Sequence, residues 1–136
     1  MCGSTDDDPD DESDDESDGE PDGGLDDDLY ARYRQAELFL RAGQPTEAAR
    51  LVTPVVAAAP ESTAALELQA RALFASAQLT GAERALRLLV DRRPDDGWGW
   101  FALARALERL GRADEAAEPR RVAEALGFRP DPPVNG

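Results

Sequence analysis

The sequence predicts an all-α fold, in which three stacked pairs of helices follow a disordered acidic N-terminal tail. Three observations predict this arrangement. Acidic residues are concentrated at the N-terminal end, apolar residues of the remainder recur at helical spacing, and a period of 34 residues aligns that remainder with itself. No run alternates apolar and polar residues long enough to indicate a strand.

The first element, residues 1–28, differs from the rest of the chain in charge. The chain has 136 residues and a formal net charge of −14, of which residues 1–28 contribute 15 acidic and no basic groups. The other 108 residues carry 14 acidic residues and 15 arginines. Residues 1–28 contain too few apolar groups to offset the roughly 1–2 kcal/mol per residue that fixing a backbone costs. We therefore predict a disordered tail over 1–28 and a nearly neutral domain after it.

Six helices are predicted in that domain because Ala, Leu, Arg, Glu and Gln dominate its composition. Glycine and proline separate them at Gly43–Pro45, Pro60, Gly81, Pro94–Gly97 and Gly111. The predicted helices cover residues 27–42, 46–58, 62–77, 80–92, 96–110 and 113–126.

The third, fifth and sixth helices have further features of their own. Leu66, Ala70 and Leu73 follow helical spacing in the third helix, and an apolar series that begins at Trp100 does so in the fifth. Pro119 lies inside the sixth helix, so we predict a kink or a break there.

The 34-residue period divides the domain into three copies, 29–62, 63–96 and 97–130, and leaves 131–136 as a flexible C-terminal tail. Small residues recur where two nested helices must approach closely, and alanine allows this without the helix penalty of glycine. The two alanine columns are Ala36, Ala70 and Ala104, and Ala48, Ala82 and Ala116.

These columns resemble the tetratricopeptide repeat (TPR) family. The third copy fits best, with Trp100, Leu103–Ala104, Leu107 and Ala116 in the pattern positions, and the second offers Leu66, Ala70, Leu73, Ala82, Leu86 and Pro94. The first copy has Arg32 where a large aromatic residue belongs. The third ends with Arg120 at a usually apolar position and Phe128 in place of the closing proline. The resemblance implies a right-handed superhelical stack of helix-turn-helix units.

The resemblance also implies a concave groove, lined by the first helix of each pair, that binds an extended peptide or a partner helix. Within it, Arg71 and Arg105 are candidates to hold a carboxylate by bidentate hydrogen bonds. The alternative is that the arginines pair along their own helices, as in Glu37–Arg41 and Glu67–Arg71. The groove candidates are Tyr33, Glu37, Arg41, Glu67, Arg71, Phe74, Trp98, Phe101, Arg105 and Arg109.

Composition argues against an enzyme. The chain has no His, no Lys and a single cysteine, Cys2, which excludes or cripples zinc sites, Ser-His-Asp triads and Schiff-base chemistry. The pairs Asp95–Asp96 and Asp114–Glu115 are interpreted as helix caps. We expect no catalytic residue, no cofactor and no metal.

The same features bear on location and on the class of partner. No apolar stretch is long enough for a membrane span, and the polyanionic tail would be repelled by nucleic acid and by anionic membranes. Absence of lysine beside 24 alanines indicates a GC-rich, bacterial genome, and we expect a cytoplasmic protein.

The predicted function is a non-enzymatic protein–protein interaction module, a small adaptor or scaffold. Two alternatives stay open: a chaperone or secretion accessory for an aggregation-prone client, and an acidic-tail mimic that captures a basic partner. The tail is further predicted to occupy the region of Arg71 and Arg105 weakly. Homodimerisation stays open, because either the polar last helix or a partner can cover the C-terminal end of the stack.

Overall fold

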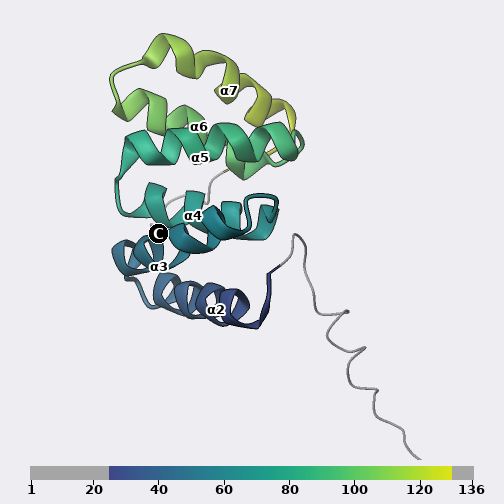
Figure 1. Ribbon diagram of the computed structural model, residues 1–136. Coiled ribbons are helices and arrows are strands. Elements are labelled where there is room, and N and C mark those ends of the chain that lie inside the picture. The colour runs from purple at the N-terminus through teal and green to yellow at the C-terminus, as the bar shows by residue number, and fades with distance from the viewer. Residues whose placement is uncertain (1–24, 130–136) are drawn as a thin grey trace, which may run out of the picture.

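The computed structural model describes residues 25–129, and these residues form a stack of helices without a strand (Figure 1). The predicted all-α fold is confirmed, and the predicted helix boundaries agree to within two residues. Predictions for residues 1–24 and 130–136 lie outside the described residues. The helices are α2 (Asp27–Arg41), α3 (Pro45–Ala58), α4 (Thr63–Ala75), α5 (Leu79–Arg92), α6 (Gly97–Arg109) and α7 (Ala113–Ala125).

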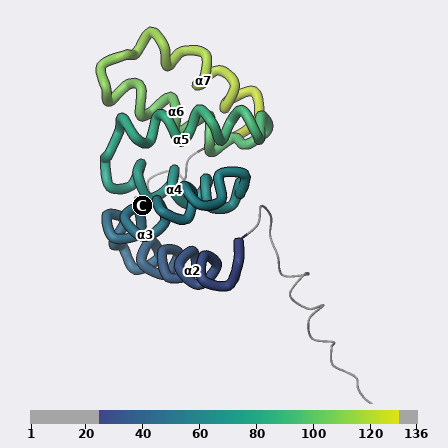
Figure 2. Tube along the Cα trace, in the orientation of Figure 1, coloured from purple at the N-terminus to yellow at the C-terminus, as the bar shows by residue number. Residues whose placement is uncertain are grey.

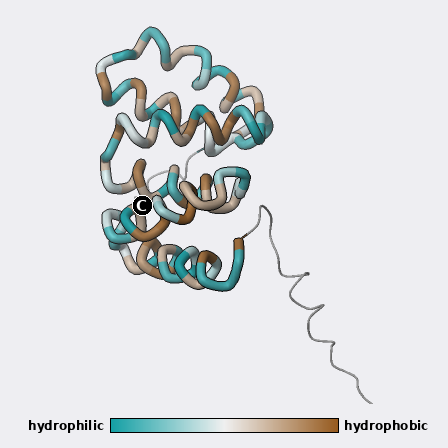
Figure 3. The backbone as a smooth tube through the Cα atoms, viewed as in Figure 1, coloured by the Kyte–Doolittle hydropathy of each residue, from teal (hydrophilic) through white to brown (hydrophobic). Residues whose placement is uncertain are grey.

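Each helix packs against the next one along the chain, and α2 also contacts α4 (Figure 2). The helices therefore pair as α2/α3, α4/α5 and α6/α7, which are the three predicted copies. Along the tube in Figure 3, hydrophobic and hydrophilic residues alternate within each helix, as expected of helices with one buried side.

The first helix of each pair begins with a side-chain cap. Asp26, Ser62 and Asp96 accept a hydrogen bond from the backbone N–H three residues later, at 2.9, 3.1 and 3.1 Å respectively. Asp96 thus acts as the cap that the sequence predicts for the Asp95–Asp96 pair. Residues 25–28, predicted as part of the tail, are structured, because Leu25 is buried and α2 begins at Asp27.

The turn inside each pair uses the left-handed backbone region. Gly43 and Gly111 have φ of 81° and 82°, and Ala77 at the equivalent position of the middle pair has φ of 62°. Glycine adopts this conformation readily, whereas a side chain makes it costly. The middle pair therefore makes the same turn as its neighbours with a less suitable residue.

The core lies along the contacts between successive helices. All six alanines of the two predicted columns are buried, and the large buried side chains include Leu66, Leu86, Leu89, Leu103 and Leu107. The small columns therefore lie where the helices approach each other, as predicted.

Pro119 does not break α7, which continues from Ala113 to Ala125. Of the predicted kink or break, the break is therefore wrong, and the kink stays a prediction. Pro119 is buried, and its ring lines a hollow together with Val90 of α5 and Leu103 of α6. We attribute the continuity to this packing, which compensates for the hydrogen bond that proline cannot donate. A second internal proline, Pro54, lies in α3 on the exposed side.

Candidate functional site

The first helices of the first two pairs enclose a hollow on one side of the stack. Its volume is about 230 Å³, and α2 and α4 supply its walls. Four of the predicted groove residues are brought together here, with Ala64 and Leu68 beside them: Tyr33, Glu37, Glu67 and Arg71.

Two further predicted residues, Phe74 of α4 and Trp98 of α6, form contacts between the second pair and the third. The guanidinium of Arg71 lies 4.0 Å from the ring centroid of Trp98, which is the geometry of a cation–π contact. Phe74 meets the same indole edge-to-face, at 6.1 Å between centroids and 89° between planes. Trp98 is therefore an aromatic platform that fixes Arg71.

Three glutamates of the first helices, Glu37, Glu67 and Glu108, are each shared by two arginines. We call them the shared glutamates. Ion pairs join Glu37 to Arg34 at 3.1 Å and to Arg41 at 3.5 Å. The intrahelical pairing that the sequence offered as an alternative is therefore present.

The other two shared glutamates join different helices. Glu67 pairs with Arg71 at 3.1 Å on its own helix and with Arg93, just beyond α5, at 2.8 Å. Glu108 of α6 pairs with Arg105 at 3.0 Å and with Arg120 of α7. Six arginines and three glutamates thus form three clusters with a combined charge of +3.

Arg71 and Arg105, predicted to act together on one carboxylate, belong to different clusters. Arg105 lines a second hollow of about 190 Å³ with Phe101 and Glu108 of α6 and Arg120 of α7. Phe128 closes this hollow, with its ring 5.2 Å from that of Phe101. Arg109, in the last turn of α6, is exposed and lines neither hollow.

Sequence reasoning missed Arg34, Arg93 and Arg120 as members of these clusters. The spacing of Arg34 and Glu37, three residues apart on a helix, was a usable signal. Arg93 and Arg120 offered none, because their partners come from other helices.

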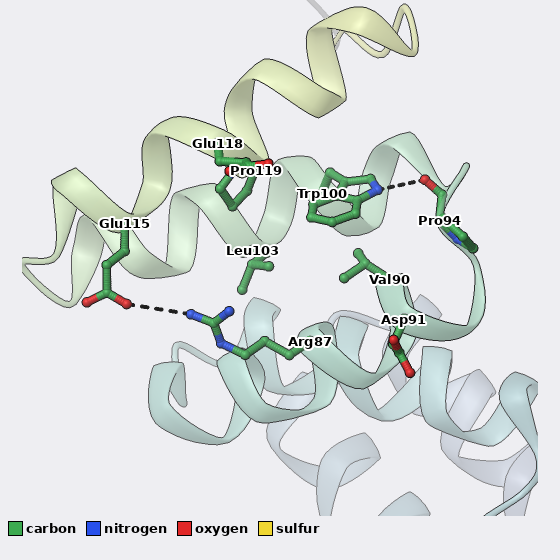
Figure 4. A pocket seen from close by; sticks show the side chains of 9 residues that line it. All are labelled: Arg87, Val90, Asp91, Pro94, Trp100, Leu103, Glu115, Glu118 and Pro119. Atoms are coloured by element: carbon green, nitrogen blue, oxygen red, sulfur yellow. Dashed lines mark hydrogen bonds and ion pairs between the residues drawn. The ribbon is translucent and has the colours of Figure 1, made fainter.

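A larger hollow of about 560 Å³ lies between α5, α6 and α7 (Figure 4). Trp100 forms part of its wall, and its indole Nε1 donates a 2.8 Å hydrogen bond to the carbonyl oxygen of Pro94. Trp100 is half-buried, and its partly exposed side chain packs against the core. The charged side chains around this hollow are Arg87, Asp91, Glu115 and Glu118, so that acidic groups outnumber basic ones.

A four-residue network beside this hollow fastens the turn before α7 to α5. Arg112 donates to both carboxylate oxygens of Glu83, at 2.7 and 3.0 Å, and also to Glu115 at 2.8 and 2.9 Å. Arg87 donates to Glu83 at 2.9 Å. The hydrogen bond from Arg112 is the main cause that lowers the pKa of Glu83 and also the pKa of Glu115.

Among residues 25–129, no group of three or more His, Cys, Asp or Glu side chains could hold a metal ion. Within the same residues, no helix is long and apolar enough to cross a membrane.

Comparison with known families identifies the repeats. The family model of the tetratricopeptide repeat matches residues 33–97 and, in a second overlapping stretch, residues 68–127. No curated protein matches the chain. The two stretches together cover well over half of the chain and reach into all six helices. The protein therefore belongs to the tetratricopeptide repeat family, whose repeats are generally protein–protein interaction modules.

Proposed function

We propose that the protein is a non-enzymatic adaptor or scaffold that binds an acidic, extended peptide of a partner protein. The binding surface is the groove formed by the first helices, α2, α4 and α6. The three shared glutamates carry this proposal, because each leaves one guanidinium charge in excess. We expect the protein to act in the cytoplasm.

Arg71 has the best-defined geometry for a partner carboxylate. Its Nε donates to Glu67 at 3.2 Å, and its Cζ lies 4.0 Å from the ring centroid of Trp98. A guanidinium carries five N–H donors, so a residue fixed in this way can still donate to an incoming carboxylate. The fixed orientation also lowers the side-chain entropy that binding costs.

The aromatic groups suit an extended peptide with apolar side chains between its carboxylates. Tyr33 of α2 and Trp98 and Phe101 of α6 are each half-buried. A partner side chain that packs on them gains burial, while its neighbouring carboxylates reach the arginines. The groove hollows carry charged side chains beside these rings, which favours a peptide ligand over an unfolded apolar client.

The test uses synthetic peptides of 12 residues with one central tryptophan: one rich in Asp and Glu, one neutral and one rich in Arg. They are titrated at low salt against a full-length variant in which the 12 acidic residues of 1–24 are Asn or Gln, so that these residues cannot compete. Fluorescence anisotropy reports the Kd, and NMR reports the indole N–H signals of Trp98 and Trp100.

We expect only the acidic peptide to bind and to shift the Trp98 signal more than the Trp100 signal. Charge reversal in Arg71→Glu/Arg105→Glu should weaken binding about tenfold or more, which corresponds to about 1.4 kcal/mol. Arg50→Glu/Arg84→Glu makes the same change in net charge on α3 and α5 and should alter the Kd by less than about twofold. Equal binding of the acidic and basic peptides would contradict the proposal.

A further inference from the structure

We propose that residues 1–24 of the chain itself occupy the groove and compete with the partner peptide. This inference rests on the proposed function, because both ligands use the same arginines. Residues 1–24 contain 12 acidic residues and no basic one. The argument depends on where this segment joins the folded part, on the charge of the two faces and on its reach.

Leu25 fixes the point from which the acidic segment starts. Its side chain is buried in the same cluster as Ala65 and Leu68 of α4. Leu68 also lines the groove hollow between α2 and α4. In Figure 1 the short purple segment before α2 turns back from the end of that helix toward α4. The acidic segment therefore begins beside the groove.

The charges of the two faces favour the groove over the opposite side. Counted with their ion-pair partners, the side chains that line the two groove hollows are six arginines and four glutamates, a charge of +2. Those that line the large hollow between α5, α6 and α7, counted in the same way, are three arginines and four carboxylates, a charge of −1. A polyanionic segment is therefore attracted to the groove and repelled from the hollow behind it.

The segment is also long enough. A flexible chain of 24 residues spans about 27 Å on average, and like charges extend it further. Neighbouring helices pack 8–10 Å apart, so that α6 lies roughly 20 Å from α2 across the groove. A ligand tethered by such a chain has an effective concentration in the millimolar range, which is sufficient for many weak carboxylate contacts to compete with a partner.

The inference can be tested with a spin label on the native cysteine and the NMR signals of the two tryptophans. Cys2 is the single cysteine of the chain, so a nitroxide spin label can be attached to the full-length protein without substitution. Trp98 lies against Arg71 in the groove, and Trp100 lines the hollow on the other side. Their two indole N–H signals therefore report separately on the two faces.

At about 0.01 M salt, where the Debye length is about 30 Å, the label should broaden the Trp98 signal more than the Trp100 signal. At about 1 M salt, where the Debye length is about 3 Å, the difference should disappear. Arg71→Gln/Arg105→Gln should reduce the difference at low salt, and the charge-matched control Arg50→Gln/Arg84→Gln should preserve it. Equal broadening of both signals at low salt, or a difference that salt leaves unchanged, would overturn the inference.

Competition gives the second readout. At low salt the acidic probe peptide should bind the wild-type chain several-fold more weakly than the variant with a neutral 1–24 segment, and the two Kd values should converge at high salt. Equal Kd values at low salt would contradict the inference and leave the groove function intact. If the neutral variant does not bind the peptide while Trp98 is still broadened selectively, the proposed function fails and the intramolecular contact stands.

Discussion

Ala77 adopts a left-handed backbone conformation at the turn where the first and third pairs have glycine. For a residue with a side chain this conformation costs roughly 1–2 kcal/mol, of which part is offset because glycine is more flexible in the unfolded chain. We predict that Ala77→Gly raises the free energy of unfolding by about 0.5–1 kcal/mol, measured by chemical denaturation.

The reverse change at the same position of the third pair serves as a matched control. A Cβ at Gly111 would meet no atom within 4 Å, so Gly111→Ala causes no steric clash. Its cost comes only from placing an alanine in the left-handed backbone conformation. It should lower the free energy of unfolding by about 1 kcal/mol. A destabilised Ala77→Gly protein would show that the strain at this turn is not relieved by glycine.

The two ion pairs of Glu67 show which contacts of the site can be predicted from the sequence and which cannot. The pairing of Glu67 with Arg71 follows from a spacing of four residues on one helix, and it could be predicted. The pairing of Glu67 with Arg93 joins residues 26 positions apart and has no counterpart in the other copies. Such a contact depends on how two helices pack, which the helical period alone does not specify.

At the scale of the elements, the turn before α7 is fastened to α5 by charged hydrogen bonds instead of apolar contacts. Arg112 and Glu83 supply most of them, and Glu83 is largely buried, with 14% of its side chain exposed. Because hydrogen bonding lowers the pKa of Glu83 in the folded protein, its carboxylate stabilises the fold only while it is ionised.

We therefore predict that Glu83→Gln lowers the free energy of unfolding by about 1 kcal/mol near neutral pH. The contribution of Glu83 is fully present above its ordinary pKa of 4.5 and is lost as the pH falls through the lower folded value. The difference between wild type and variant, followed by thermal unfolding from about pH 7 to about pH 3, should therefore shrink below about pH 4.5.

Glu118→Gln provides the control for this titration, because Glu118 is a highly exposed glutamate of α7. Its unfolding should resemble that of the wild type across the range. A Glu83→Gln difference that stays constant down to about pH 3 would mean that the carboxylate does not contribute through its charge.

The stack as a whole ends with a polar outer face. Leu86 and Val90 of α5 are buried below α6, and the equivalent positions of α7 are Arg120 and Glu124. Arg120, which departs from the family pattern, pairs with Glu108. Phe128 packs beside it against Phe101. Both arrangements that the sequence left open, a self-capped end and an end covered by a partner, stay predictions.

This end depends on Gly97. A Cβ at Gly97 would lie 2.7 Å from the Cβ of Phe128, which sits too close to the backbone to move cheaply. We predict that Gly97→Ala lowers the free energy of unfolding by about 1–3 kcal/mol, although alanine is the better helix former.

A double-mutant cycle by chemical denaturation tests the assignment to Phe128. In the Phe128→Gly background the clashing Cβ is absent, and Gly97→Ala should cost less or become stabilising. If Gly97→Ala lowers the free energy of unfolding by the same amount in both backgrounds, contact with Phe128 is not the cause of the destabilisation.

The fold could be predicted from the sequence to a large extent because it is local. Each helix follows from its own composition and every turn but that at Ala77 from its own glycine or proline, and the 34-residue period repeats the helices. The continuity of α7 through Pro119 and the closure of Phe128 onto Gly97 could not be predicted, because both depend on surfaces that form only when the pairs stack.

Under the proposed function, the sharing of each groove glutamate by two arginines would also determine how a partner is bound. An incoming carboxylate would meet guanidinium groups that already donate to a glutamate, so it would share their N–H donors with that glutamate. The net gain from each such contact is small, as it is for other exposed ion pairs. A groove of this kind would release its ligands quickly and would discriminate between them by their number of negative charges. It would therefore favour transient complexes over permanent ones.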